Sequence, residues 1–138
     1  MTKKILIAED DKSMRNCYDT ILGFYLKEYE LMFAENGQIA IDIYKKEGKD
    51  IVVFLTDGNM PVKNGLEAAF EIKEEAKRNG RSIPTIMITS EGGYISGFKE
   101  RLPQIISRID YLVEKPFKSN DYVIATVQEA IQSRENKK

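Results

Sequence analysis

Polar side chains with chemical potential follow four short apolar runs of this sequence. They are Glu9, Asp10 and Asp11 after residues 5–8, Asp57 after residues 51–55, Thr89 at the end of residues 83–89, and Lys115 after residues 111–113. Each group alone has an ordinary structural explanation, because acids often cap helices, Asp-Gly pairs often form turns and Lys-Pro often ends a strand. The occurrence of all of them in this order is much harder to explain structurally, and it indicates a functional site.

The acidic side chains in this set favour a hard metal ion. Clustered carboxylates repel one another, and one of them would take up a proton unless a cation lay between them. Oxygen ligands without His or Cys suit Mg²⁺, which keeps several waters and can also bind a phosphoryl oxygen. Asp57 would then attack phosphorus as a carboxylate nucleophile. The Thr89 hydroxyl and the Lys115 ammonium would compensate the charge on the transferred group.

The apolar runs alternate with amphipathic segments, which predicts an α/β fold. Strands are expected at residues 5–8, 30–34, 51–55, 83–89 and 111–113. Between and after them, apolar residues at helical spacing predict four helices. Their apolar stripes are Met14, Cys17, Tyr18, Ile21, Leu22 and Tyr25; Ile39, Ala40, Ile43 and Tyr44; Leu66, Ala69, Phe70 and Ala76; and Val123, Val127, Ala130 and Ile131. Such alternation predicts a doubly wound parallel sheet with helices on both faces. In these folds the working site lies beyond the carboxyl ends of the strands, where the polar groups would converge.

The segment 91–109 is the hardest part of the chain to assign. Its apolar residues share a helical face, but Pro103 interrupts that face. Proline inside a helix costs about 3 kcal/mol, so a kink or two short helices are expected.

Length and composition predict one domain of an ordinary globular kind. The chain has 138 residues, of which 42% are hydrophobic and 31% charged. Its net charge of −1 lacks the positive excess of nucleic-acid-binding proteins. The absence of His and the single Cys17 exclude His-based catalysis, an internal disulfide and Cys-cluster zinc sites. The run at residues 5–8 is too short for a signal peptide or membrane span, so we expect a cytoplasmic protein without membrane insertion.

These residues together resemble the receiver domains of two-component response regulators. The motifs that carry the resemblance are the acidic pair after the first strand, Asp57-Gly58-Asn59-Met60-Pro61 with Asn64-Gly65-Leu66, Thr89, and Lys115-Pro116-Phe117. The resemblance implies a single receiver domain over residues 1–138, with a core at about 3–131 and a polar tail at 132–138. The implied fold is (βα)5, a five-stranded parallel sheet in the order 2-1-3-4-5.

By this resemblance Asp57 is the phospho-acceptor. Asp10 is expected to bind Mg²⁺ directly, Glu9 through water, and Asn59 through its main-chain carbonyl, and Mn²⁺ would substitute for Mg²⁺. Asp11 falls one place beyond the family's acidic pair, so we expect it to cap a helix instead.

The resemblance also assigns roles around the phosphoryl group. Thr89 and Lys115 are expected to act on the phosphoryl group itself. Asn59 and Glu91 occupy the positions that flank the path of hydrolytic water in the family, so we expect this polar pair to give a short phosphoryl lifetime.

The implied function is that of a stand-alone receiver. A sensor histidine kinase or a histidine phosphotransfer protein would phosphorylate Asp57. The signal would then pass to a protein target that docks on the face made by the fourth helix, the fifth strand and the last helix. Such a domain is a switch that assists its own phosphorylation and dephosphorylation, and is not a turnover enzyme.

Two features depart from the family pattern. The interval between Thr89 and Lys115 is longer than usual. Leu112 stands three residues before Lys115, where the family usually has its switch aromatic, and Tyr111 is one place off, on the opposite strand face. The second departure bears on the Thr–aromatic switching mechanism and leaves the phosphoryl chemistry intact.

Two alternatives use the same residues differently. A haloacid-dehalogenase-type phosphatase also has a strand-end Asp nucleophile and Mg²⁺, but it places a second Asp two residues later as general acid. Here that position is Asn59, which cannot protonate a leaving group. A pseudo-receiver that serves only as a binding module is the other alternative, and the intact acidic trio with Thr89 and Lys115 argues against it.

Overall fold

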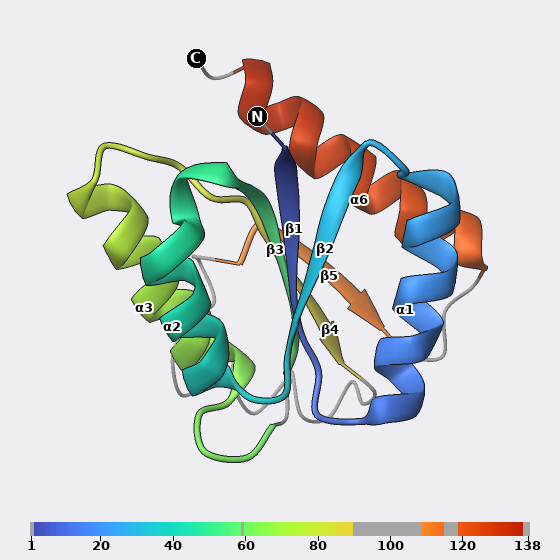
Figure 1. Cartoon of the computed structure of the whole chain (residues 1–138), viewed down its shortest axis with the longest axis horizontal. Coiled ribbons are helices and arrows are strands. Elements are labelled where there is room, and N and C mark those ends of the chain that lie inside the picture. Colours follow the sequence, from blue (N-terminus) through green and yellow to red (C-terminus); the bar gives the residue numbers. More distant parts are fainter. Residues whose placement is uncertain (1, 59, 90–108, 115–118, 137–138) are drawn as a thin grey trace.

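The computed structural model of the chain describes residues 2–58, 60–89, 109–114 and 119–136. The elements are β1 (Lys3–Ala8), α1 (Lys12–Tyr25), β2 (Tyr29–Ala34), α2 (Gly37–Glu47), the 3-10 turn η1 (Gly48–Asp50), β3 (Ile51–Asp57), α3 (Gly65–Arg78), β4 (Thr85–Thr89), β5 (Tyr111–Glu114) and α6 (Asn120–Asn136). All neighbouring strands are parallel, in the order β2-β1-β3-β4-β5. In Figure 1, α1 and α6 cover one face of the sheet, and α2 and α3 cover the other. The predicted doubly wound fold and its strand order are confirmed.

Side chains of the strands alternate between two cores, one on each face of the sheet. Ile5 and Ile7 of β1 pack in the first core together with α1 and α6. Leu6 and Ala8 pack in the second core together with α2 and α3. Residues 51–56 of β3 are all buried, because this central strand is covered on both faces. This explains why the strands appear in the sequence as continuous apolar runs.

Three apolar side chains predicted to face the core are exposed instead. Tyr25 is 54% exposed, and Ile39 and Phe70 are each 37% exposed. Ile39 and Phe70 each stand beside a fully buried alanine, Ala40 or Ala69. Consecutive helical residues point about 100° apart, so only one of each pair occupies the centre of the buried stripe. Tyr25 is the last residue of α1, and the following residue, Leu26, packs in the first core in its place.

Side-chain caps set the start of the first three helices. Asp11 accepts a hydrogen bond of 2.9 Å from the Ser13 N–H, and Asn36 caps α2 in a similar way. Asn64 and Glu67 form a reciprocal capping box at the start of α3. Each cap satisfies a backbone N–H that the helix itself leaves unpaired. The prediction that Asp11 is a helix cap is therefore confirmed.

The last helix continues beyond the predicted end of the core. α6 runs to Asn136, so residues 132–136 of the expected polar tail are helical. Its final turns contact the rest of the domain, since Arg134 Nε donates to the Ser82 carbonyl at 3.2 Å and Lys3 Nζ lies 2.9 Å from Glu135 Oε1. Of the segment 91–109, where a kink is expected, residues 91–108 lie outside the described residues.

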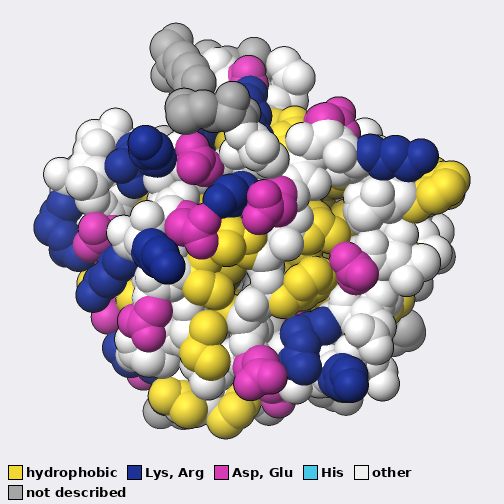
Figure 2. All heavy atoms as spheres, in the orientation of Figure 1, with side chains coloured by type: hydrophobic (Ala, Val, Ile, Leu, Met, Phe, Trp, Pro, Cys, Tyr) yellow, Lys and Arg dark blue, Asp and Glu magenta, His cyan; other side chains and the backbone are white. Residues whose placement is uncertain are grey.

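The surface carries charges of both signs. Lys and Arg side chains are interspersed with Asp and Glu on the face shown in Figure 2, in keeping with the net charge of −1. Among the described helices, none is both long enough and apolar enough to cross a membrane.

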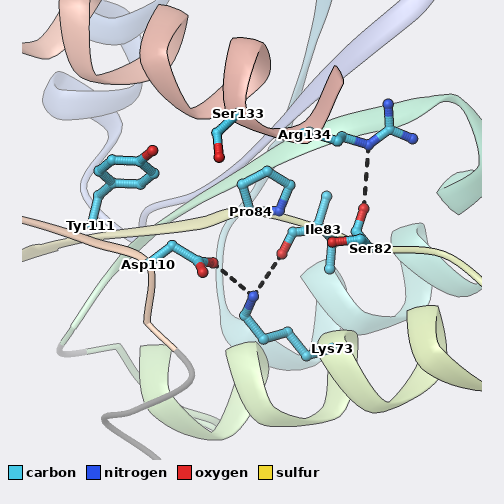
Figure 3. Close-up of a pocket in the computed structure, with 8 residues that line it drawn as sticks. All are labelled: Lys73, Ser82, Ile83, Pro84, Asp110, Tyr111, Ser133 and Arg134. Carbon is cyan, nitrogen blue, oxygen red and sulfur yellow. Dashed lines mark hydrogen bonds and ion pairs between the residues drawn. The ribbon is translucent and has the colours of Figure 1, made fainter. Parts of the chain in front are cut away.

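A polar network joins the elements at the amino-terminal edge of the sheet. Asp110 Oδ2 accepts from Lys73 Nζ at 2.7 Å and from the Thr85 N–H at 2.8 Å, while the Asp110 N–H donates to the Thr85 carbonyl at 3.0 Å. Lys73 Nζ also donates to the Ile83 carbonyl at 2.8 Å. Lys73, Ile83 and Asp110 line a cavity of about 200 Å³ between α3, the start of β5 and the end of α6 (Figure 3). Asp110 thus ties β5 to β4 and to α3.

Tyr18 places a phenol inside the first core. Its side chain is 2% exposed and lies on α1. Burial raises the pKa of Tyr18 well above its ordinary value, and the negative charges of Glu9 and Asp57 raise it further. The phenol therefore remains protonated in the folded protein.

We predict that Asp110→Ala destabilises the fold by about 1–3 kcal/mol. The substitution leaves the buried Thr85 N–H and the Lys73 ammonium without their shared acceptor. Chemical denaturation would measure the free energy of unfolding. Asp110→Asn, which keeps an acceptor oxygen, should lose less. The control Asp19→Ala, at an exposed position of α1, should change the free energy by no more than about 0.5 kcal/mol. Equal losses in Asp110→Ala and the control would contradict this role.

We predict that Tyr18 makes the fold less stable at alkaline pH. Because the pKa of Tyr18 is raised in the folded protein, its contribution is complete below the unfolded pKa of about 10 and is lost as pH rises above it. Relative to Tyr18→Phe, the wild type should lose about 1.4 kcal/mol of unfolding free energy per pH unit above pH 10. Denaturation at pH 8 to 11 would measure the difference. The exposed-site control Tyr25→Phe should run parallel to wild type, and a parallel Tyr18→Phe curve would show that the prediction is wrong.

Candidate functional site

Three carboxylates meet at the carboxyl-terminal edge of the sheet. Glu9, Asp10 and Asp57 each place one carboxylate oxygen within 4.8 Å of the others. Glu9 and Asp10 follow β1, and Asp57 is the last residue of β3. The strands are neighbours, with Ala8 opposite Thr56, so the residue after each partner lies at the same edge. The structure thus brings together the three acids that strand order predicted to converge.

The three acids differ in exposure and in their local contacts. Glu9 is buried, with 1% of its surface exposed. Its Oε2 accepts from the Asp11 N–H at 3.2 Å, and its backbone carbonyl accepts from Arg15 Nη1 at 2.9 Å. Asp57 is half-buried and Asp10 is exposed. The cluster is therefore anchored in the protein at Glu9 and open to solvent at Asp10.

The backbone around Asp57 is held by close contacts. The Gly58 N–H donates to the Ile88 carbonyl at 3.0 Å, and the Gly65 N–H donates to the Gly58 carbonyl at 3.1 Å. A Cβ atom at Gly65 would lie 2.2 Å from the Asp57 carbonyl oxygen, so only glycine allows α3 to start this close to the acceptor. The sequence contained Gly65 within a recognisable motif, but this packing role could not be inferred from it.

Thr89 lies at the end of the strand next to Asp57. It is the last residue of β4 and is 3% exposed. Asp57 stands opposite Ile88 across the β3–β4 pair, so Thr89 is one residue beyond that pairing. β5 ends opposite Thr89, at Glu114. The remaining predicted site residues, Asn59, Glu91 and Lys115, lie outside the described residues.

Tyr18 is a neighbour of the cluster that the sequence identified only as a core residue. Burial is the main cause of the raised pKa of Tyr18, and the negative charges of Glu9 and Asp57 add to it. The apolar spacing of α1 predicted the burial of Tyr18. The strand order alone did not predict that its phenol comes within range of the charges of the acids.

The donor set suits the metal that the sequence favours. All three side chains offer carboxylate oxygens, the ligands that Mg²⁺ prefers, and one of them is open to water. Magnesium keeps several of its own waters, so a partly open set of a few carboxylates fits its coordination better than a closed protein cage. The residues present therefore fit a Mg²⁺ site.

Leu112, which occupies the family's switch position, and its neighbour Tyr111 face opposite sides of β5. Leu112 is 41% exposed. Tyr111 is half-buried and packs against the first core. The predicted difference in strand face between these two residues is confirmed, and the outward position carries an aliphatic side chain.

Comparison with known proteins agrees with this geometry. Residues 5–128 match the family model of the response regulator receiver domain. A "Chemotaxis protein CheY homolog" of Campylobacter jejuni is 32% identical over 114 residues, which cover 83% of this chain and 82% of the relative. "Chemotaxis protein CheY1" of Helicobacter pylori is 29% identical over 116 residues, covering 83% and 86%.

A solved structure shares the fold of this chain. The receiver domain protein of Clostridium thermocellum superposes with a TM-score of 0.80 at 18% identity, and the match covers 99% of both chains. None of these matches points toward the phosphatase alternative. With the family model covering most of its length, the chain belongs to the response regulator receiver domains.

Proposed function

We propose that this receiver accepts a phosphoryl group on Asp57 in a Mg²⁺-dependent reaction. The donor would be a phosphohistidine on a sensor histidine kinase or on a histidine phosphotransfer protein. The observation that carries the proposal is the meeting of Glu9, Asp10 and Asp57 within 4.8 Å at the strand ends of a receiver domain.

The acids have separate tasks in this proposal. Glu9, Asp10, Asp57 and the main-chain carbonyl of Asn59 would hold the metal, with Glu9 acting through water. The bound Mg²⁺ would neutralise charge on the phosphoryl oxygens and let an anionic donor approach the acids. The burial of Glu9 and its bond from the Asp11 N–H keep one carboxylate fixed in place. Asp10 and Asp57 remain accessible to the incoming group.

Asp57 would act as the nucleophile. A carboxylate oxygen of Asp57 attacks phosphorus in line, and the bond from phosphorus to the donor imidazole breaks, so that an acyl phosphate forms on Asp57. The Thr89 hydroxyl donates a hydrogen bond to a phosphoryl oxygen, and the Lys115 ammonium balances its charge. Hydrolysis of the acyl phosphate returns Asp57 to its starting state, so the domain assists its own resetting but turns over no independent substrate.

The signal would leave through protein contacts. Leu112 on β5 and Tyr122 on α6 are 41% and 42% exposed, so each of these two elements presents an apolar side chain that a protein target could contact. The proposal includes a cytoplasmic location, because a histidine kinase makes its phosphohistidine from ATP on the cytoplasmic side. Nucleic acid is not part of the proposal, since the chain has no net positive charge.

We predict that small phosphodonors such as acetyl phosphate modify Asp57 only when Mg²⁺ is present. The acidic cluster repels an anionic donor until a cation is bound. Intact-protein mass and peptide mapping would locate the adduct. Asp57→Asn should abolish it, and Asp10→Ala should weaken Mg²⁺ binding by more than about tenfold. The control Asp42→Asn, at an exposed position of α2, should label normally. Equal labelling in excess chelator would rule the mechanism out.

We predict that Asn59→Met and Glu91→Leu each prolong the phosphoryl group on Asp57 several-fold. Asn59 and Glu91 are short or flexible polar side chains that can leave a channel and orient a water in line with the phosphorus–oxygen bond, whereas bulky apolar groups exclude it. The decay of phospho-Asp57 after donor removal would be followed by mass. Glu28→Leu, which changes an exposed acid beyond α1, is the matched control. Unchanged decay in both variants would mean that these positions do not set the lifetime.

A further inference from the structure

The loop between Asp57 and α3 contains a strained residue. Val62 has a φ of 68° and, among the described residues, is the only non-glycine with a positive φ. β-Branched residues avoid this region because Cβ crowds the backbone carbonyl. The Val62 side chain is 75% exposed, so its own packing does not hold the residue in this conformation.

Anchors on both sides hold Val62 in this conformation. We call residues 60–64 the strap. Met60 is 7% exposed and packs in the second core. At the other end, Asn64 is fixed by its capping box with Glu67, and the adjoining Gly65 N–H donates back to the Gly58 carbonyl at 3.1 Å. Strain of this kind persists only where the surroundings over-determine the backbone.

The strap also contacts the start of α2. The Gly37 N–H donates to the Lys63 carbonyl at 3.1 Å. A Cβ atom at Gly37 would lie 2.4 Å from that same carbonyl oxygen, so the strap fits against α2 with no room for a side chain. Lys63 follows Val62 directly, and its carbonyl position therefore depends on the Val62 backbone.

We infer that the strap couples Asp57 to the amino-terminal end of α2. The strain at Val62 favours the breaking of the hydrogen bond between the Lys63 carbonyl of the strap and the Gly37 N–H of α2. This inference rests on the proposed phosphorylation of Asp57. A charge change at Asp57 acts on the strap through Gly58 and Gly65, which contact the acceptor backbone. When Val62 relaxes to a negative φ, the Lys63 carbonyl moves away from the Gly37 N–H. The free energy stored as backbone strain at one such residue is of the same order as the coupling free energies between sites in allosteric proteins.

The test compares wild type with Val62→Asn and Val62→Ile. Asn tolerates a positive φ, so it removes the strain, whereas Ile keeps the β-branched side chain and serves as the matched control. Each protein would be studied with Mg²⁺, with and without excess acetyl phosphate. The readouts are the amide hydrogen exchange of Gly37 by NMR, the extent of Asp57 modification by mass, and the Tm.

We expect the Gly37 amide to exchange faster in the phosphorylated wild type and in Val62→Ile. In Val62→Asn the strap keeps its conformation without backbone strain, so hydrogen exchange of the Gly37 amide should stay slow on phosphorylation. For the same reason, the Tm should be a few degrees higher than in wild type. Modified Asp57 with unchanged Gly37 exchange in wild type would overturn the coupling alone. A Tm of Val62→Asn no higher than that of Val62→Ile would overturn the claim that the positive φ of Val62 strains the folded protein. Absence of any adduct on Asp57 would overturn the proposed function together with this coupling.

Discussion

The parallel pairing of β1 with β3 is the constraint on which the rest of this domain depends. It places the residues after Ala8 beside those after Thr56, so negative side chains must share one edge of the sheet. Like charges at this distance raise the free energy of the folded state unless a cation or hydrogen bonds compensate them. Here the Asp11 N–H donates to Glu9 and the backbone of Asp57 is fixed by Gly58 and Gly65. The local structure around both strand ends therefore serves to hold acids that would otherwise move apart.

The two ends of the sheet have different chemistry. At the amino-terminal edge, Asp110 meets Lys73, and opposite charges close the structure. At the carboxyl-terminal edge, the acids Glu9, Asp10 and Asp57 meet one another. Charge attraction thus stabilises one end of the strands, and repulsion between carboxylates destabilises the other. This arrangement is expected when a fold supports a site whose ligand supplies the missing positive charge.

Much of this domain could be predicted from its sequence. Buried parallel strands appear as continuous apolar runs such as residues 51–55, and strand order then followed from the likeness to a known family. Convergence of the three acids required only this order, because parallel strands end at one edge. Asp11 was predictable as a cap, since it precedes an amphipathic stretch at the spacing that caps require.

Other features depend on contacts that a periodic pattern does not contain. Ile39 and Phe70 were placed on the core side because a stripe does not reveal which of two consecutive apolar residues points inward. Residues 132–136 were predicted as part of a polar tail, because they are polar, but they form the last turns of α6 and are held by one ion pair to Lys3 and by a hydrogen bond to the Ser82 carbonyl. The close approach of Gly65 to Asp57 and the strain at Val62 depend on three-dimensional crowding, which sequence spacing leaves open.

The division of the interior by the sheet bears on how such a domain diversifies. Side chains of β1 alternate between a core shared with α1 and α6 and a core shared with α2 and α3. Free-energy changes at well-separated sites without shared partners are nearly additive, so substitutions in the helices on one face of the sheet leave the packing of the helices on the other face largely unaffected. During evolution, substitutions can therefore change the α1–α6 side so that it recognises new partners. The α2–α3 side and the strand ends can change independently of them. Evolvability of this kind follows from placing the sheet between two independent interiors.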